Sequence, residues 1–405
     1  MADALEVSLL TFMSACAGIE WGLSSDQKAA ITGIVFAGIL VGSLFWGIIA
    51  DRFGRKKTLI WVYFIISVFG ILSGLAPNYI WLIIFRALVG FGIGGANIPF
   101  DLLAEFLPLS HRRTFLVYIE YFRSIGSLFV AGFAWSCLST FGWRFLTLMT
   151  TIPVILTSLL SILYLPESPR WLLLKGRKDE AERVVREAAA VNGFTMPPFS
   201  LATDLGDLNS HTNGSYLDFI NIVEPKQISV SSSMLPGSNS SGGGGIPIIS
   251  HYKNIPLYSA IKMDIIKEFS YSDLLKMKEI RNISIPLWIL WGIFGFTYYG
   301  IIIFVSRLYS YNEEDDSTDI CNFDYKSIFL NSLAELLGVF ISSLLIDKCG
   351  RIYTQFLFYC IAGISAYLMG LNINGYNLLL IAGIARMSIM ASSVSFFFFS
   401  IFVTH

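Results

Sequence analysis

Ionisable side chains stand inside apolar segments of this 405-residue chain, where they could bind ions. Asp3 and Glu6 are three positions apart in an apolar stretch at the N-terminus, so a helix would place both on one face. A carboxylate at the depth of a lipid bilayer is costly unless a cation, a proton or a partner neutralises it. We therefore interpret the two acids as cation- or proton-binding groups. The alternative is that both lie in water at an exposed end of the chain.

Two further apolar segments carry ionisable residues at helical spacing. Glu120 and Arg123 would share a helix face, where they could bind a substrate or satisfy each other as a structural ion pair. Glu335 lies in the other segment, with Asn331 one turn before it on the same side. Because an acid within a membrane span indicates a functional site by default, we include these four residues in a candidate substrate- or proton-binding set.

Two adjacent tyrosines, Tyr298 and Tyr299, lie deep in a third apolar segment. Aromatic faces attract organic cations and stack on planar organic acids. We expect the tyrosines to line the same cavity as the acids.

A charged phrase at the end of an apolar segment occurs twice and predicts an internal duplication. The two copies lie 347 − 51 = 296 positions apart, counted between their aspartates. The first copy contains Gly47, Asp51, Arg52, Gly54 and Arg55, and the second contains Asp347, Gly350 and Arg351. Secondary transporters build a central site from duplicated helical bundles of this kind. The simpler alternative is that these charges only mark a cytoplasmic loop.

Arg86 and Arg386 repeat at a similar offset, 386 − 86 = 300 positions, in similar apolar settings. We expect the two arginines to lie at matching depths in the two halves of the protein. Snorkelling of their guanidinium groups to the membrane surface is the alternative.

The composition indicates a membrane protein. Hydrophobic residues make up 54% and charged residues 14% of the chain, which is more apolar surface than a soluble protein can hide. The segments long and apolar enough to span a bilayer are 30–50, 58–75, 80–103, 115–138, 145–165, 283–305, 329–346, 353–370 and 378–403. The sequence contains no metal-binding spacing, no nucleophile–base pair and no nucleic-acid signature. We expect an integral multi-pass membrane protein that is not an enzyme and that uses no cofactor, metal or nucleic acid.

Lysine and arginine are concentrated in alternate loops, which predicts that the repeated phrase and a long polar insertion lie in the cytoplasm. The insertion divides the chain into an N-terminal helical bundle (1–165), a cytoplasmic loop (166–282) and a C-terminal helical bundle (283–405). Within the loop we expect short helices, one of them over 178–191, and a disordered middle rich in serine and glycine.

Four phrases resemble the signatures of the major facilitator superfamily. They are Gly47-x-x-x-Asp51-Arg52-x-Gly54-Arg55-Lys56, the glycine-rich run from Arg86 to Gly95, Glu105 to Pro108 with Arg112 and Arg113, and Pro166 to Trp171. The segments similar to its synaptic-vesicle-2-related and organic ion transporter branch are Met1 to Glu6, Glu20-Trp21, Val89 to Gly95 and Tyr298 to Gly300. The resemblance implies an all-α fold of two pseudo-symmetric six-helix bundles. It also implies that this chain holds about nine and a half to ten of the family's twelve helices, without the start of the first span and without the last two.

The resemblance implies roles for individual residues. Charged residues at the cytoplasmic helix ends would form a gate that closes one conformational state and opens in the other. This gate comprises Gly47, Asp51, Arg52, Gly54, Arg55, Glu105, Arg113, Glu167, Arg170, Asp347, Gly350 and Arg351. Arg86 and Arg386 would couple proton movement to the alternation. Arg123 departs from the aromatic residue expected at its position in the family.

The sequence thus predicts a transporter that moves a small organic ion, either an organic cation or an aromatic organic acid, by alternating access. A proton or a sodium ion could be coupled to it, as in a symporter, and we expect a monomer in the plasma membrane or in an intracellular vesicle. Two alternatives stay open. The phrase Pro-Glu-Ser-Pro-Arg also fits a sugar or phosphate porter of the superfamily, although the acids at Asp3 and Glu6 argue against it. The other is a non-transporting vesicle or membrane binding protein with the same fold.

Overall fold

The computed structural model describes residues 2–107, 109–193, 278–309, 323–371 and 376–404, and the regular elements in these ranges are helices. They are α1 (Ala2–Glu20), α2 (Ser25–Phe53), α3 (Arg55–Gly74), α4 (Tyr79–Ile93), α5 (Ile98–Phe106), α6 (Leu109–Phe133), the π-helix η1 (Ala134–Leu138), α7 (Ser139–Tyr164), α8 (Pro169–Leu174), α9 (Lys178–Val191), α14 (Lys278–Leu308), α15 (Tyr325–Cys349), α16 (Arg351–Met369) and α17 (Tyr376–Thr404). The helix predicted over 178–191 is present as α9, and a further short helix, α8, precedes it. The Ser/Gly-rich middle of the loop lies outside the described residues.

The chain divides into two compact units. One consists of Met1–Thr203 with Trp291–His405, and the other of Asp204–Leu290. The site residues in the described ranges belong to the first unit, including those of α14 from Trp291 onward. The division into 1–165, 166–282 and 283–405 stays a prediction.

Eight helical segments in the described residues are long and apolar enough to cross a bilayer. One of them, Val117–Tyr164, contains most of α6 and all of α7 and so covers two predicted spans. Gly142 has a φ of 78° within this segment and kinks it. The kink falls between the spans predicted over 115–138 and 145–165.

One predicted span contains two helices. The segment 80–103, predicted as a span, lies within the candidate span Tyr79–Phe106, in which α4 ends at Ile93 and α5 begins at Ile98. Gly94 and Gly95 follow α4, and Pro99 lies in the first turn of α5. Glycine weakens a helix interior and proline is favoured at a helix start, which explains the break.

Helix α1 is enclosed by other helices. Leu5, Leu9 and Met13 on successive turns are fully buried, and α1 packs against α2, α6 and α7. The side chains of Glu6 and Asp3 are 1% and 14% exposed. The alternative that both acids lie in water is therefore wrong.

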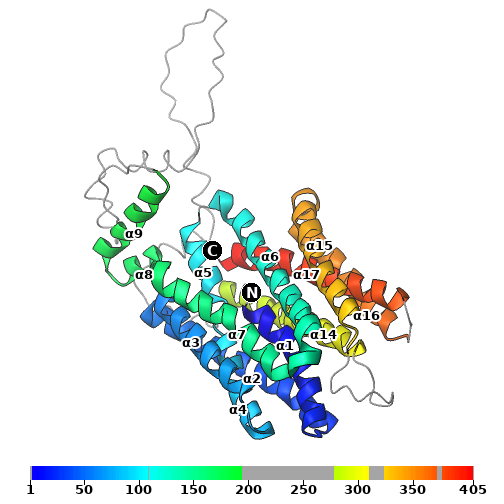
Figure 1. Ribbon diagram of the computed structural model, residues 1–405. Coiled ribbons are helices and arrows are strands. Elements are labelled where there is room, and N and C mark those ends of the chain that lie inside the picture. The colour runs from blue at the N-terminus through cyan, green and yellow to red at the C-terminus, as the bar shows by residue number, and fades with distance from the viewer. Residues whose placement is uncertain (1, 108, 194–277, 310–322, 372–375, 405) are drawn as a thin grey trace, which may run out of the picture. The chain divides into compact units, whose positions relative to one another are not determined.

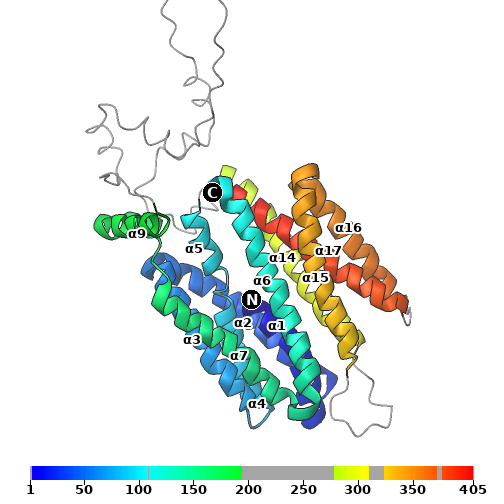
Figure 2. The same ribbon diagram turned by 45° about the horizontal axis from the view of Figure 1, so that its top comes forward.

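The predicted duplication is visible in the helix packing. Gly38 of α2 lies so close to α4 that a Cβ there would collide with the carbonyl oxygen of Ala87. Gly338 of α15 approaches α17 in the same way, at the carbonyl oxygen of Met387. Both partners of the second contact lie 300 positions after those of the first (338 − 38 = 387 − 87 = 300). Figures 1 and 2 show the two helix pairs, α2 with α4 in blue and α15 with α17 in orange and red.

The turns at the two charged phrases repeat as well. Gly54 and Gly350 have φ values of 105° and 80°. The Thr58 hydroxyl donates to the Gly54 carbonyl oxygen at 2.7 Å, and the Thr354 hydroxyl donates to the Gly350 carbonyl oxygen at 2.7 Å. Because such a backbone is essentially restricted to glycine, the phrase requires this residue in both copies.

Replacing Gly338 with alanine should push α15 and α17 apart, because the new Cβ would meet backbone rather than a flexible side chain. We expect a loss of about 1–3 kcal/mol, the usual cost of overpacking. Gly363 of α16 is the control, since a Cβ there meets open space and alanine has the higher helix propensity. The midpoint of thermal unfolding in detergent should fall for Gly338→Ala and hold or rise for Gly363→Ala. Equal midpoints would contradict the close approach of the two helices.

Candidate functional site

Arg86 of α4 is buried and forms an ion pair with Glu6 of α1. Arg86 Nη1 lies 2.6 Å from Glu6 Oε2, and the side chains are 0% and 1% exposed. In the part of the chain that the structure describes, Arg86 Nε and Nη2 and Glu6 Oε1 have no hydrogen-bond partner. Snorkelling to the surface is therefore wrong for Arg86, and its pair is only partly satisfied by hydrogen bonds.

The repeated arginine, Arg386 of α17, pairs with Glu335 of α15. Arg386 Nη2 lies 2.5 Å from Glu335 Oε1, and both side chains are 2% exposed. Arg386 Nη1 also donates to the Ser332 hydroxyl at 3.3 Å, and Asn331 is buried on the same helix. Each half of the protein thus buries an arginine against a glutamate, a pairing that the sequence analysis did not predict. The glutamates come from non-equivalent helices.

A third cluster joins α1, α6 and α14. Arg123 Nη2 donates to Asp3 Oδ2 at 2.8 Å, whereas Glu120 Oε2 lies 3.9 Å from Arg123 Nη1. The Arg123 guanidinium lies 5.1 Å from the centre of the Tyr298 ring, and the Tyr299 hydroxyl lies 3.4 Å from both carboxylate oxygens of Asp3. Asp3 rather than Glu120 is therefore the closer partner of Arg123. The structure brings the predicted acids and tyrosines together here.

The three clusters contain one more carboxylate than guanidinium group. The carboxylates are Asp3, Glu6, Glu120 and Glu335, and the guanidinium groups are Arg86, Arg123 and Arg386. The pairs at Arg86 and Arg386 are matched one to one, so the additional carboxyl group belongs to the third cluster. When it is ionised, a carboxyl group in a weakly polar interior attracts a cation.

Ser332 and Ser393 contact these clusters and were not identified from the sequence. Ser332 lies three positions before Glu335, so helical spacing could have found it. Ser393 of α17 donates to Glu120 Oε2 at 3.3 Å, across a sequence separation of 273 residues. No sequence pattern around Ser393 indicates this contact.

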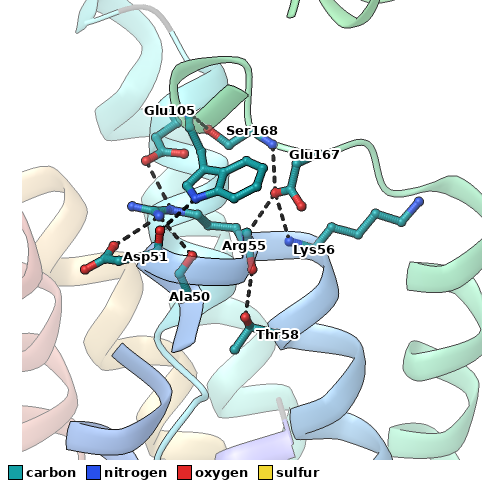
Figure 3. Close-up of polar contacts among 10 residues, drawn as sticks. Ala50, Asp51, Arg55, Lys56, Thr58, Glu105, Glu167 and Ser168 are labelled. Carbon is teal, nitrogen blue, oxygen red and sulfur yellow. Dashed lines mark hydrogen bonds and ion pairs between the residues drawn. The ribbon is translucent and has the colours of Figure 1, made fainter. Parts of the chain in front are cut away.

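Arg55 at the start of α3 lies at the centre of a second site, the expected gate (Figure 3). Its Nη1 lies 3.0 Å from Asp51 Oδ1 and donates to the Ala50 carbonyl oxygen at 3.1 Å. Its Nε lies 3.6 Å from Glu105 Oε1 on α5. The indole of Trp171 on α8 donates to the Asp51 carbonyl oxygen at 2.9 Å. Four helices therefore meet at one guanidinium group and its acidic partners.

Glu167 caps the first turn of α3. Its Oε1 accepts hydrogen bonds from the backbone N–H groups of Arg55 at 2.8 Å and Lys56 at 3.1 Å (Figure 3). A carboxylate at a helix N-terminus satisfies N–H groups that lack helical partners and interacts favourably with the helix dipole. Gly54 lies so close that a Cβ there would collide with this carboxylate.

The other residues expected in the gate are Gly47 and Arg52 in α2, Arg113 in α6, Arg170 in α8, Asp347 in α15, and Gly350 and Arg351 at the start of α16. Arg52 and Arg170 are exposed, and the Arg52 guanidinium lies 5.5 Å from the centre of the Phe53 ring. The side chains of Arg113 and Asp347 lie outside the described residues. The gating role of the whole set stays a prediction.

Alanine should cost more at Gly54 than at Gly350, although both glycines have positive φ. This backbone region costs an L residue about 1–3 kcal/mol, which both variants incur. Only at Gly54 would the Cβ also collide with Glu167, since a Cβ at Gly350 meets open space in the described structure. We expect the midpoint of thermal unfolding in detergent to be lower for Gly54→Ala than for Gly350→Ala. If the two variants unfold together, Glu167 does not hold the start of α3 in this position.

Residues 7–197 match the family model described as sugar (and other) transporter. The organic cation/carnitine transporter 7 of Arabidopsis thaliana is 32% identical over 359 residues, which cover 87% of this chain and 66% of that protein. The synaptic vesicle 2-related protein of Xenopus laevis is 28% identical over 411 residues, which cover 95% of this chain and 62% of that protein. This chain spans slightly less than two thirds of the length of these relatives.

Among solved structures, the xylose transporter XylE of E. coli in a partially occluded inward-open conformation has a similar fold. The TM-score is 0.59 at 16% identity, and the match covers 97% of this chain and 84% of that chain. An identity this low shows the fold alone. The helical fold with its repeated contacts agrees with the similarity to the curated relatives. The chain is a multi-pass membrane protein that belongs to the major facilitator superfamily, in its synaptic-vesicle-2-related branch.

Proposed function

We propose that this protein transports a small organic cation across a membrane by alternating access. One observation carries the proposal, namely the excess of one carboxylate in an interior cluster that also contains two tyrosines. A cation would neutralise the carboxylate, and an aromatic face would bind the organic part of the ligand. Membership of the superfamily supports transport, and one similar protein is itself named an organic cation/carnitine transporter.

The charges argue against the other substrates that the sequence left open. An aromatic organic acid would bring a fifth negative charge to a region with three arginines. A sugar carries no charge and would leave the excess carboxylate without a counter-ion. A cation is the only one of the three that lowers the electrostatic cost of the interior.

Glu6 and Arg86 suit a role in proton coupling. A proton on Glu6 would cancel the charge that attracts Arg86, so proton binding and the packing of α1 against α4 would be linked. We propose that the end of the protein that carries Arg55 and the loop 166–282 faces the cytoplasm, following the distribution of basic residues. We also propose that the transporter acts as a monomer.

Replacing Glu335 with glutamine should suppress transport while the protein remains folded, because glutamine can still accept a hydrogen bond from Arg386 but lacks the charge. We expect uptake of labelled tetraethylammonium into proteoliposomes to fall about tenfold, equivalent to about 1.4 kcal/mol. The control is Glu20→Gln, since Glu20 pairs with Arg144 of α7 rather than with the three clusters. Uptake by the parent protein equal to that of empty liposomes would favour a non-transporting role. Unchanged uptake by Glu335→Gln would remove Glu335 from the site.

Glu6→Gln should separate substrate movement from proton movement. We expect an imposed pH gradient to stimulate uptake by the parent protein and to have almost no effect on the variant. Exchange of labelled for unlabelled cation without a gradient should continue in the variant, because it needs no net proton transfer. A variant with the same response to the gradient as the parent would exclude Glu6 from coupling.

A further inference from the structure

The Arg123 guanidinium occupies the position that an organic cation would take. It donates to Asp3 at 2.8 Å, lies 3.9 Å from Glu120 and lies 5.1 Å from the centre of the Tyr298 ring. Carboxylates beside an aromatic face are the surroundings in which proteins bind guanidinium and ammonium groups. The cluster therefore resembles a cation-binding site in which the bound cation is the guanidinium group of Arg123.

The pair of Arg123 and Asp3 is more accessible than the other two interior ion pairs. Their side chains are 12% and 14% exposed, compared with 0–2% for the pairs at Arg86 and Arg386. Arginine is long and has many rotamers, so its head group can move while α6 keeps its place.

Glu120 Oε1 and the Tyr298 hydroxyl are buried polar atoms of the cluster without a hydrogen-bond partner among the described residues. Their side chains are each 2% exposed. A buried acceptor without a donor is costly, so such atoms indicate groups that find a partner in another state of the protein. Glu120 is also the carboxyl group without an arginine of its own, since Arg123 is closer to Asp3.

We propose that Arg123 is a tethered competitor, which fills the cation position while no substrate is bound. An incoming monovalent guanidinium or ammonium group displaces it from Asp3, and Arg123 then pairs with Glu120. The occupied site holds two balanced pairs, substrate with Asp3 and Arg123 with Glu120, so the excess charge of the empty site disappears. This inference rests on the proposed function, because the displacing group is that of the transported cation.

The test must separate the effect of removing Arg123 from the effect of changing the net charge of the site. Arg123→Gln alone makes the site more negative and would bind any cation better through charge. The double variant Arg123→Gln/Glu120→Gln has the same net charge as the parent protein but lacks the competitor. The probe is phenylguanidinium, a monovalent cation with one aromatic ring, and phenylurea is its uncharged analogue. Binding is measured by calorimetry on the purified full chain in lipid nanodiscs.

We expect the double variant to bind phenylguanidinium about tenfold more tightly than the parent protein, because no fraction of the sites is filled by Arg123. Glu120→Gln alone should bind it about tenfold more weakly, because the displaced Arg123 then has no carboxylate with which to pair. Arg144→Gln, in the separate pair with Glu20, should bind it as the parent does. Phenylurea should show no gain in the double variant. A double variant that binds the cation no more tightly than the parent would overturn the proposal, as would the absence of binding in every protein.

A measurement on the unmodified protein covers the case in which the double variant does not fold. In protein labelled with ¹⁵N-arginine, the side-chain signal of Arg123, assigned from its loss in Arg123→Gln, should shift when phenylguanidinium binds. An Arg123 signal that stays in place at saturating probe would also overturn the proposal. Failure of the proposed function has a different signature, in which the probe binds as expected but is not taken up by proteoliposomes.

Discussion

An unpaired charge in the weakly polar interior of a helical membrane protein costs much free energy. The buried charges of the first unit are therefore paired, and the pairs join different helices. Arg86 ties α4 to α1, Arg123 ties α6 to α1, and Arg386 ties α17 to α15. Removing one member of such a pair typically costs about 3–5 kcal/mol, because the other charge is left buried alone. The ion pairs therefore restrict which helix arrangements are possible, because any rearrangement must give each buried charge a new partner.

The close contacts between helices repeat in the two halves, whereas the charged partners of the buried arginines differ. A Cβ at Gly42 of α2 would collide with the carbonyl oxygen of Phe91, and the position 300 residues later is Ser342, whose hydroxyl donates to the Ala391 carbonyl oxygen at 2.8 Å. The two halves thus maintain one helix contact by different means. Two similar halves with different charge partners give an asymmetric set of ion pairs.

The sequence predicted which residues belong to the site better than it predicted which of these residues contact one another. The phrases that resemble the superfamily predicted one cluster at the cytoplasmic helix ends that includes Asp51, Arg55 and Glu105, and these three side chains do lie together. The matching offset of Arg86 and Arg386 also predicted two buried arginines correctly. Such inferences work because helical spacing and repeated phrases can be recognised in the sequence without knowing which helices pack together.

Pairing between helices could not be predicted in the same way. Asp3 and Glu6 share a face of α1, yet they are one turn apart and meet different helices, with Arg123 of α6 and Arg86 of α4 as their partners. The contact of Glu120 with Ser393 depends on the packing of α6 and α17, for which no sequence spacing exists. The break between α4 and α5 was in principle visible, because Gly94, Gly95 and Pro99 are all unfavourable within a helix.

The most direct test of the charge constraint is a double-mutant cycle on Arg386 and Glu335, with thermal stability in detergent as the measurement. Arg386→Met and Glu335→Leu each leave one charge buried without its partner, so each single variant should unfold at a lower temperature than the parent protein. The double variant removes both charges and keeps similar side-chain volumes, so it should recover most of the lost stability. A double variant whose loss equals the sum of the two single losses would show that the charges are uncoupled and would contradict the constraint.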